Sequence, residues 1–169
     1  MPPDAAAPEF SRLLPLGLVG PEGRREVLEA DEAERAALAR RFGIPAVERL
    51  RAELLLRPEA DGAVRVEGRL AAAVVQLCVV TLEPVAQRVE EAVALRLLPP
   101  GREPQDEPDE PDEVATRSGV ADLGEAVAEQ LALALDPYPR APDAALPAKA
   151  SDAAEHPLAA LAKLRGAKH

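Results

Sequence analysis

The chain has 169 residues and a formal net charge of −10, and 47% of its residues are hydrophobic but only 2% aromatic. The apolar fraction suffices for one folded domain and excludes a wholly disordered chain. The scarcity of aromatic rings argues against binding single-stranded nucleic acid by base stacking, and the sequence contains no basic run of the kind that duplexes attract. We therefore expect no DNA partner.

The single cysteine excludes an internal disulfide and a cysteine-rich zinc site within one chain. Residues 1–9 are rich in proline and alanine, are expected to be loose, and lack the pattern of a secretory signal. The longest apolar run, residues 70–80, is far shorter than the ~20 residues of a membrane-spanning helix. These features predict a cytoplasmic protein without a membrane partner.

The first predicted elements are two strands and a helix. Residues 10–18 have the composition of a strand that a proline confines to a sheet edge, and residues 24–29 are expected to be the returning strand. Asp31 is a favourable N-cap for a helix, and Glu34 completes a capping box. Gly43 is expected to end this helix.

Three long strands are predicted to follow as an antiparallel meander. Residues 47–57 alternate in polarity, with one face formed by Glu48, Leu50, Ala52, Leu54 and Leu56. An Asp-Gly pair in residues 58–62 predicts a hairpin, after which residues 64–82 form a strand whose later part is apolar on both faces. Such a strand is expected at the sheet centre, covered on both sides. Residues 85–98 favour a third strand, although residues 85–94 also fit helical spacing.

The remaining chain is expected to hold two helices between proline-rich segments. Residues 99–119 are predicted to form an acidic, proline-rich loop that cannot bury a core. Residues 136–156 are expected to be irregular, and residues 157–166 to form a short helix. Asp122 is expected to cap a helix that packs on the sheet, with Glu125 at the capping-box position and an apolar face of Leu123, Val127, Leu131 and Leu135.

The short terminal helix is amphipathic. Its leucines share one face and its end is basic, so it could dock on its own domain or in the groove of a partner. The residues concerned are Leu158, Leu161, Lys163, Leu164 and Arg165. Together the predicted elements favour an α+β fold, in which helices pack on an antiparallel sheet that could close into a barrel.

No catalytic or metal-binding pattern is evident in the sequence. Cys78 lies in an apolar stretch without a base or cation that would lower the pKa of its thiol, which predicts a core cysteine. Both histidines, His156 and His169, fall in the last fourteen residues. Neither a phosphate-binding glycine loop nor the spacing of a calcium loop is present. We therefore expect a protein that is not an enzyme and holds no cofactor or metal.

Three stretches resemble, in order, the YceD family of large ribosomal RNA subunit accumulation proteins. The family signature Cys-x-x-Cys-Leu-x-Pro is matched at Cys78, Leu82 and Pro84, with Glu83 at the variable position. Thr81 replaces the second cysteine, which removes any two-thiol redox or metal role. The other stretches are Asp122-Leu123-Gly124-Glu125, followed by Tyr138-Pro139-Arg140, and His156-Pro157-Leu158-Ala159-Ala160-Leu161.

The resemblance covers residues 10–166 and implies a single YceD-like domain with a non-enzymatic role in large-subunit ribosomal RNA accumulation and ribosome biogenesis. Because the chain is acidic, a basic ribosomal or ribosome-assembly protein is the expected partner, and contact with ribosomal RNA is a further option. Two alternatives stay open. One is a metal-dependent RNA-processing enzyme that uses Glu83 and nearby carboxylates, and the other is a protein-interaction adaptor unrelated to ribosomes.

Overall fold

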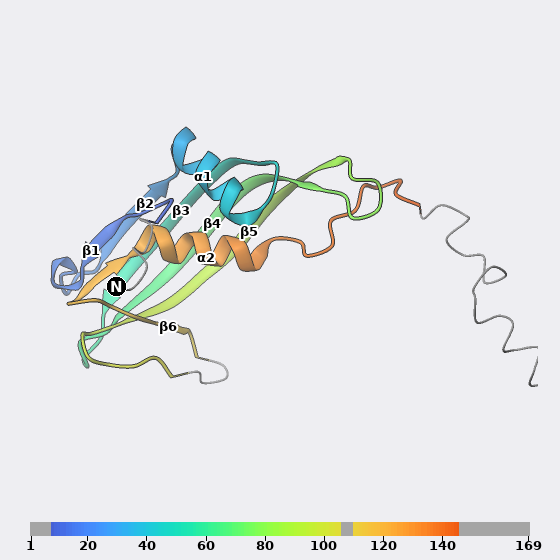
Figure 1. Ribbon diagram of the computed structural model, residues 1–169. Coiled ribbons are helices and arrows are strands. Elements are labelled where there is room, and N and C mark those ends of the chain that lie inside the picture. Colours follow the sequence, from blue (N-terminus) through green and yellow to red (C-terminus); the bar gives the residue numbers. More distant parts are fainter. Residues whose placement is uncertain (1–7, 106–109, 146–169) are drawn as a thin grey trace, which may run out of the picture.

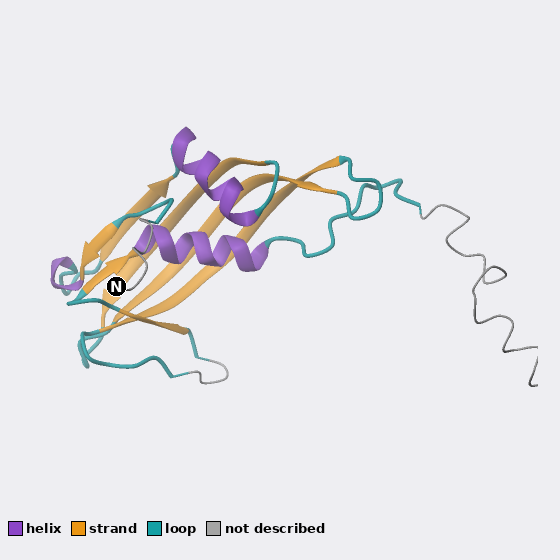
Figure 2. Ribbon diagram, viewed as in Figure 1, coloured by secondary structure: helices purple, strands orange, loops and turns teal. Residues whose placement is uncertain are grey.

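The computed structural model describes residues 8–105 and 110–145 (Figure 1). Within them the chain has the predicted α+β fold, in which two helices lie on one face of a curved five-stranded sheet (Figure 2). In chain order the elements are β1 (Leu13–Pro15), a 3-10 helix (Leu16–Leu18), β2 (Arg24–Glu29), α1 (Glu32–Phe42), β3 (Ala46–Pro58), β4 (Val64–Leu77), β5 (Pro84–Leu98), β6 (Asp112–Ala115), β7 (Val120–Asp122) and α2 (Leu123–Ala134).

The large sheet is open and has the strand order β2-β3-β4-β5-β6. Its edges are β2 and β6, so the barrel that the sequence allowed does not form. Strands β2 to β5 pair antiparallel, and β6 pairs with β5 in parallel. β5 pairs with β4 from Pro84 to Leu97, which confirms the strand prediction for residues 85–98 and rules out the helical alternative there.

The core fills the space between the sheet and the two helices. In β4, in β5 and in β3 from Leu50 onward, every second side chain points toward the helices, because successive residues of a strand face opposite sides. The largest fully buried side chains include Phe10, Leu38, Leu50, Leu56, Leu70, Leu97 and Leu131. Leucine, valine and alanine thus form most of this core.

β4 is central in the sheet but is covered on one side only. It ends at Leu77 and not at the predicted Leu82, and on its open side Ala71 is exposed and Leu77 is 46% exposed. Both helices pack on the opposite face (Figure 2). The expected double cover is absent in the described residues, because three of the seven side chains on the open side of β4 are charged and two are alanines, which leaves little apolar surface to bury.

A β-bulge in β3 changes which residues face the core. The pairing with β4 shifts between Val47 and Arg49, and Glu48 is left without a partner. Val47 and Leu50 are both buried although they lie three residues apart, while Glu48 is exposed. The prediction that Glu48 shares a face with the leucines was wrong, because the extra residue resets the alternation.

β1 does not form the predicted hairpin with β2. Its three residues pair with β7, which lies far along the chain, and β2 pairs instead with β3. The 3-10 helix of residues 16–18 turns the chain away directly after Pro15, so that the two strands are never aligned. Within the described residues, the short strand β1 is therefore paired only by β7.

α1 forms as predicted. Asp31 and Glu34 make the reciprocal capping box, and Gly43 ends the helix with a φ of 66°, a left-handed conformation that favours glycine. Neither helix in the described part of the chain is long and apolar enough to cross a membrane. The predicted terminal helix, residues 157–166, and the end of the irregular segment, residues 146–156, lie outside the described residues.

The acidic proline-rich segment contains a strand, β6, that the sequence analysis did not predict. β6 runs parallel to the last residues of β5. Arg96 of β5 holds three carboxylates around it: Glu59 at 2.7 Å, Asp61 at 2.5 Å and Glu113 of β6 at 2.5 Å. This ion-pair cluster joins the β3–β4 hairpin to the acidic segment and compensates the repulsion between its carboxylates.

We predict that the cluster makes the fold sensitive to acid. Arg96 lowers the pKa of Glu59, and Arg102 lowers the pKa of Asp61 to about 2. A carboxyl group whose pKa is depressed by folding stabilises the fold above its unfolded pKa of about 4, and this contribution is lost as the pH falls through the folded pKa. The urea midpoint of unfolding should therefore fall between about pH 5 and about pH 2.

The same titration on Arg96→Gln should give a smaller fall in the urea midpoint, because Glu59 loses its main partner and Asp61 and Glu113 each lose one of theirs. Arg25→Gln is the matched control, since Arg25 makes no ion pair within the described residues. If Arg96→Gln and Arg25→Gln show the same pH dependence, the cluster does not control the acid response.

Candidate functional site at the turn between β4 and β5

The turn of residues 78–83 joins β4 to β5 and carries the Cys-x-x-Thr-Leu-Glu-Pro pattern. The Cys78 N–H donates to the Glu83 carbonyl (2.8 Å), and the Leu82 N–H donates to the Cys78 carbonyl (2.9 Å). Leu82 has a φ of 61°, in the left-handed region that side chains other than glycine rarely adopt. The hydrogen bonds therefore hold the turn in one conformation despite the backbone strain at Leu82.

A second segment, residues 136–141 after α2, lies against this turn. The Val79 N–H donates to the Pro139 carbonyl (2.9 Å), and the Gln76 side-chain amide donates to the Asp136 carbonyl (2.9 Å). Two stretches that carry the family resemblance, far apart in the sequence, thus form one local structure. The sequence analysis did not predict this contact, because no local pattern indicates which strand end the segment after a helix will meet.

Cys78 lies just after β4, fully buried at the base of the turn. Its sulfur accepts hydrogen bonds from the backbone N–H groups of Val80 (3.4 Å), Thr81 (3.4 Å) and Ala141 (3.3 Å). The Thr81 side chain and these N–H groups lower the pKa of the Cys78 thiol to about 7, although burial acts in the opposite direction. The prediction of a core cysteine is confirmed, since Cys78 is fully buried. The sequence analysis considered only a base or a cation as the cause of a lower thiol pKa, whereas the donors here are the Thr81 side chain and backbone N–H groups of the turn and of a remote segment.

We predict that Cys78 stabilises the fold as a hydrogen-bond acceptor. Cys78→Ala leaves three N–H groups without their acceptor and opens a small cavity, which should lower the free energy of unfolding by ~1–2 kcal/mol. A thiol pKa lowered to about 7 stabilises the fold fully above the unfolded value of about 8.5, and this contribution is lost as the pH falls through the folded pKa.

Urea unfolding of wild type and Cys78→Ala at about pH 6.5 and about pH 9 tests this linkage. The stability difference between the two proteins should be larger at the higher pH. Cys78→Ser keeps an acceptor atom, so its free energy of unfolding should lie between those of the wild type and Cys78→Ala. A difference that is independent of pH would show that the folded protein does not favour the thiolate.

The last residue of β4, the turn and the segment after α2 expose four large apolar side chains, which we call the motif-turn patch: Leu77 (46% exposed), Val79 (47%), Leu82 (71%) and Tyr138 (71%). Figure 1 shows the end of the molecule where the turn after β4 extends beyond both helices and meets the chain that follows α2. Single exposed apolar side chains are common, but a group of them on two joined segments is typical of an interaction site.

The second stretch of family resemblance lies at the start of α2 and has a structural role. The Asp122 carboxylate accepts hydrogen bonds from the N–H groups of Gly124 (3.1 Å) and Glu125 (3.2 Å), which caps the helix. It also accepts from the Ser11 hydroxyl (2.6 Å) and the Arg12 N–H (2.8 Å). One carboxylate thus joins the N-terminal segment to α2.

Glu125 does not complete the predicted capping box. Its carboxylate instead forms two hydrogen bonds with the guanidinium of Arg41 on α1, at 2.8 and 2.7 Å, and this contact raises the pKa of Arg41. Leu123 is buried in the core. The four residues of this stretch therefore hold α1, α2 and the N-terminal segment together, and they lie at the other end of α2 from the motif-turn patch.

Gly124 is required by the close approach of the N-terminal segment. A Cβ atom at this position would lie 2.5 Å from the Phe10 carbonyl oxygen, whereas a Cβ at Gly17 would meet nothing within 4 Å. We predict that Gly124→Ala lowers the free energy of unfolding by roughly 1–3 kcal/mol, while Gly17→Ala changes it by less than about 0.5 kcal/mol. Urea denaturation of both variants is the measurement, and equal stabilities would contradict the close packing.

Glu83 accepts a hydrogen bond from the Thr81 hydroxyl (3.2 Å) at the exposed side of the turn. Within residues 8–105 and 110–145, no three histidine, cysteine, aspartate or glutamate side chains are grouped closely enough to hold a metal ion. The docking residues predicted in the terminal helix lie outside these ranges: Leu158, Leu161, Lys163, Leu164 and Arg165.

Comparison with known proteins places these features in a family. The family model described as "Large ribosomal RNA subunit accumulation protein YceD" matches residues 66–165. The match covers more than half of the chain, including the turn after β4 and the start of α2. No curated protein and no solved structure matches the chain significantly. The chain therefore belongs to the YceD family, whose name connects it with the accumulation of large-subunit ribosomal RNA.

Proposed function

We propose that this chain promotes the accumulation of large-subunit ribosomal RNA without catalysing a reaction, by binding a ribosomal or ribosome-assembly protein at the motif-turn patch. The observation that supports this proposal is the exposure of Leu82 and Tyr138, each 71% exposed, on segments whose backbones are held by hydrogen bonds. A partner that covers both side chains gains the burial of two large apolar groups, each of which contributes about 1.5–3 kcal/mol.

The geometry of the turn favours binding over packing within the domain. Leu82 adopts a left-handed φ of 61°, which costs on the order of 1–3 kcal/mol, and its side chain nevertheless points into solvent. A strained backbone that buries nothing in its own domain is typical of recognition sites. Because the turn is already ordered, it loses little conformational entropy when a partner binds there.

The charge of the chain indicates the chemistry of the partner. With a formal net charge of −10, the protein attracts basic proteins at long range, and this attraction increases the rate of encounter. Ribosomal and ribosome-assembly proteins of basic composition fit this requirement. Apolar contacts at the motif-turn patch would then determine the lifetime of the complex.

Replacement of Leu82 tests the proposal in cells that lack the endogenous protein. Leu82→Asp should reduce large-subunit ribosomal RNA severalfold relative to the wild-type protein, and it should abolish co-sedimentation with large-subunit precursors on sucrose gradients. Leu133→Asp is the matched control, because Leu133 is also exposed (78%) but lies on α2. This control should restore ribosomal RNA to the wild-type level.

The outcomes separate the candidate functions. Equal loss with Leu82→Asp and Leu133→Asp would contradict a specific role for the motif-turn patch. Normal ribosomal RNA in cells without the protein, together with co-purification of a non-ribosomal partner, would support an adaptor unrelated to ribosomes. Loss of ribosomal RNA processing in Glu83→Gln, with binding intact, would support a metal-dependent enzyme.

A further inference from the structure

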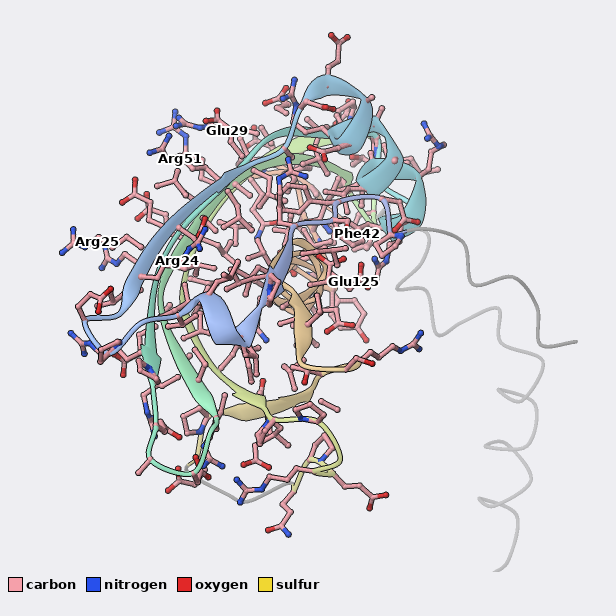
Figure 3. The ribbon with its side chains drawn as sticks, turned by 90° about the vertical axis from the view of Figure 1, so that its left-hand side faces the viewer. Arg24, Arg25, Glu29, Phe42, Arg51 and Glu125 are labelled. Atoms are coloured by element: carbon pink, nitrogen blue, oxygen red, sulfur yellow. The ribbon has the colours of Figure 1, made fainter. Side chains whose placement is uncertain are left out.

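The pairing register gathers arginines on the sheet face that the helices leave open. Residues paired across neighbouring strands point to the same side, so Arg49, Ala73 and Arg88 form one row across β3, β4 and β5. Figure 3 shows Arg25 and Arg51 pointing outward from the convex side of the curved sheet. The sequence contains no basic run because these arginines alternate with residues that face the core.

The arginines near the β3–β4 hairpin are already engaged with carboxylates. Arg57 pairs with Glu67 (3.6 Å), Arg65 pairs with Glu59 (2.8 Å), and Arg96 forms the cluster described above. The fixed acidic partners at this end of the face compete with any external anion. This end is therefore a poor place for a polyanion to bind.

Four arginines elsewhere on the open face make no ion pair within the described residues: Arg25, Arg49, Arg69 and Arg88. All four are exposed and come from four neighbouring strands. Long-range attraction to anions is strongest where a guanidinium has no carboxylate of its own.

The open face differs in charge from the rest of the protein. Its paired positions hold eight arginines, namely the seven above and Arg51, against the five glutamates Glu29, Glu53, Glu67, Glu90 and Glu113. These paired positions carry +3, and the hairpin carboxylates Glu59 and Asp61, which are bound to Arg65 and Arg96, reduce the charge of the face to +1. The rest of the chain carries −11, which together with the face gives the total of −10. The bulged Glu48 lies outside this register and borders a separate hollow beside α1.

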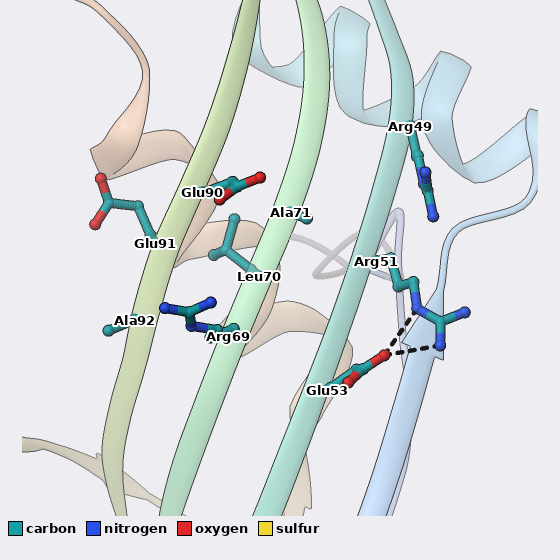
Figure 4. A pocket seen from close by; sticks show the side chains of 9 residues that line it. All are labelled: Arg49, Arg51, Glu53, Arg69, Leu70, Ala71, Glu90, Glu91 and Ala92. Carbon is teal, nitrogen blue, oxygen red and sulfur yellow. Dashed lines mark hydrogen bonds and ion pairs between the residues drawn. The ribbon is translucent and has the colours of Figure 1, made fainter.

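A hollow of about 410 Å³ lies in the middle of this face. Figure 4 looks onto it with α2 behind the strands: Arg49 and Arg69 stand at its sides, and Ala71 lies between them. Three carboxylates also line it: Glu53 is held by Arg51 at 2.9 Å, whereas Glu90 and Glu91 make no ion pair within the described residues. The small side chains of Ala71 and Ala92 leave the strands accessible at the bottom of the hollow. The backbone of a ligand can therefore approach the strands while the arginines contact its charged groups.

We infer that the open face binds the phosphate backbone of RNA, with Arg49, Arg69 and Arg88 as the contacts. This inference rests on the proposed function, because large-subunit ribosomal RNA is the polyanion that the family name supplies. Arginine forms bidentate hydrogen bonds with phosphate, which suits a chain of repeated anions. The lining of the hollow contains no aromatic ring, so the contacts are made to phosphate and not by base stacking, and binding tolerates different sequences.

Equilibrium filter binding of the full chain to purified, protein-free large-subunit ribosomal RNA tests the inference. The double variant Arg69→Ala with Arg88→Ala should weaken binding roughly tenfold at about 0.15 M salt, and it should reduce the slope of log K against log[salt] by roughly 1.4, as expected for two lost contacts to single strands. Adding Arg49→Ala should weaken binding further.

The matched control is Arg40→Ala with Arg117→Ala. Both arginines are exposed, make no ion pair within the described residues and lie off the open face, and their replacement removes the same charge. This control should bind RNA within about twofold of wild type. Equal weakening in the two double variants would indicate attraction by total charge only and would overturn the inference, as would unchanged binding by Arg69→Ala with Arg88→Ala.

The inference and the proposed function can fail separately. Leu82→Asp should keep wild-type affinity for naked RNA in the filter assay while losing large-subunit ribosomal RNA accumulation in cells. If the purified wild-type protein does not bind RNA but Leu82→Asp still loses function in cells, the RNA-binding face is wrong and the protein-binding patch stands. If Leu82→Asp is fully active in cells while the arginine variants lose RNA binding, the protein-binding patch is wrong and the RNA-binding face stands.

Discussion

The burial of a long sheet on one face only is the constraint on which the other features depend. β4 and β5 contain 14 and 15 residues, whereas α1 and α2 contain 11 and 12. At about 3.3 Å per residue in a strand and 1.5 Å in a helix, the strands extend for roughly 50 Å and the helices for roughly 18 Å. Two such helices cannot cover the full length of even one face. The end of the β4–β5 hairpin therefore lies beyond the core, and the second face has no cover from described residues.

Both candidate surfaces follow from this arrangement, and the β4–β5 hairpin contributes to both. The motif-turn patch combines the end of this hairpin with Tyr138 after α2, and the open face extends from β4 and β5 to β3 and β2. The turn keeps its shape with a single cysteine, because the Cys78 sulfur accepts hydrogen bonds from N–H groups of the turn and of the segment after α2. Thr81, at the position of the second cysteine of the signature, supports this arrangement through its own N–H and its side chain.

Local patterns in the sequence predicted local structure well. The capping box of Asp31 and Glu34, the helix end at Gly43 and the alternation of β5 depend on residues close in the chain, and all were predicted. The pairing of β1 with β7, the parallel strand β6 and the contact of Glu125 with Arg41 depend on residues far apart, which no periodicity reveals. For the candidate surfaces, the turn was located from its signature. The open face required the pairing register of four strands, including a bulge at Glu48 that changes which side chains point outward.

The open sheet also leaves two edges, whose unpaired backbone groups could recruit strands from other molecules. The edge formed by β2 has the sequence Arg-Arg-Glu-Val-Leu-Glu, so four of its six side chains are charged. The other edge, β6, is only four residues long, follows Pro111 and begins with Asp112 and Glu113. Charge on one side, and shortness with a preceding proline on the other, disfavour the addition of further strands. A protein with an uncovered sheet face is thereby protected against growth into edge-to-edge aggregates.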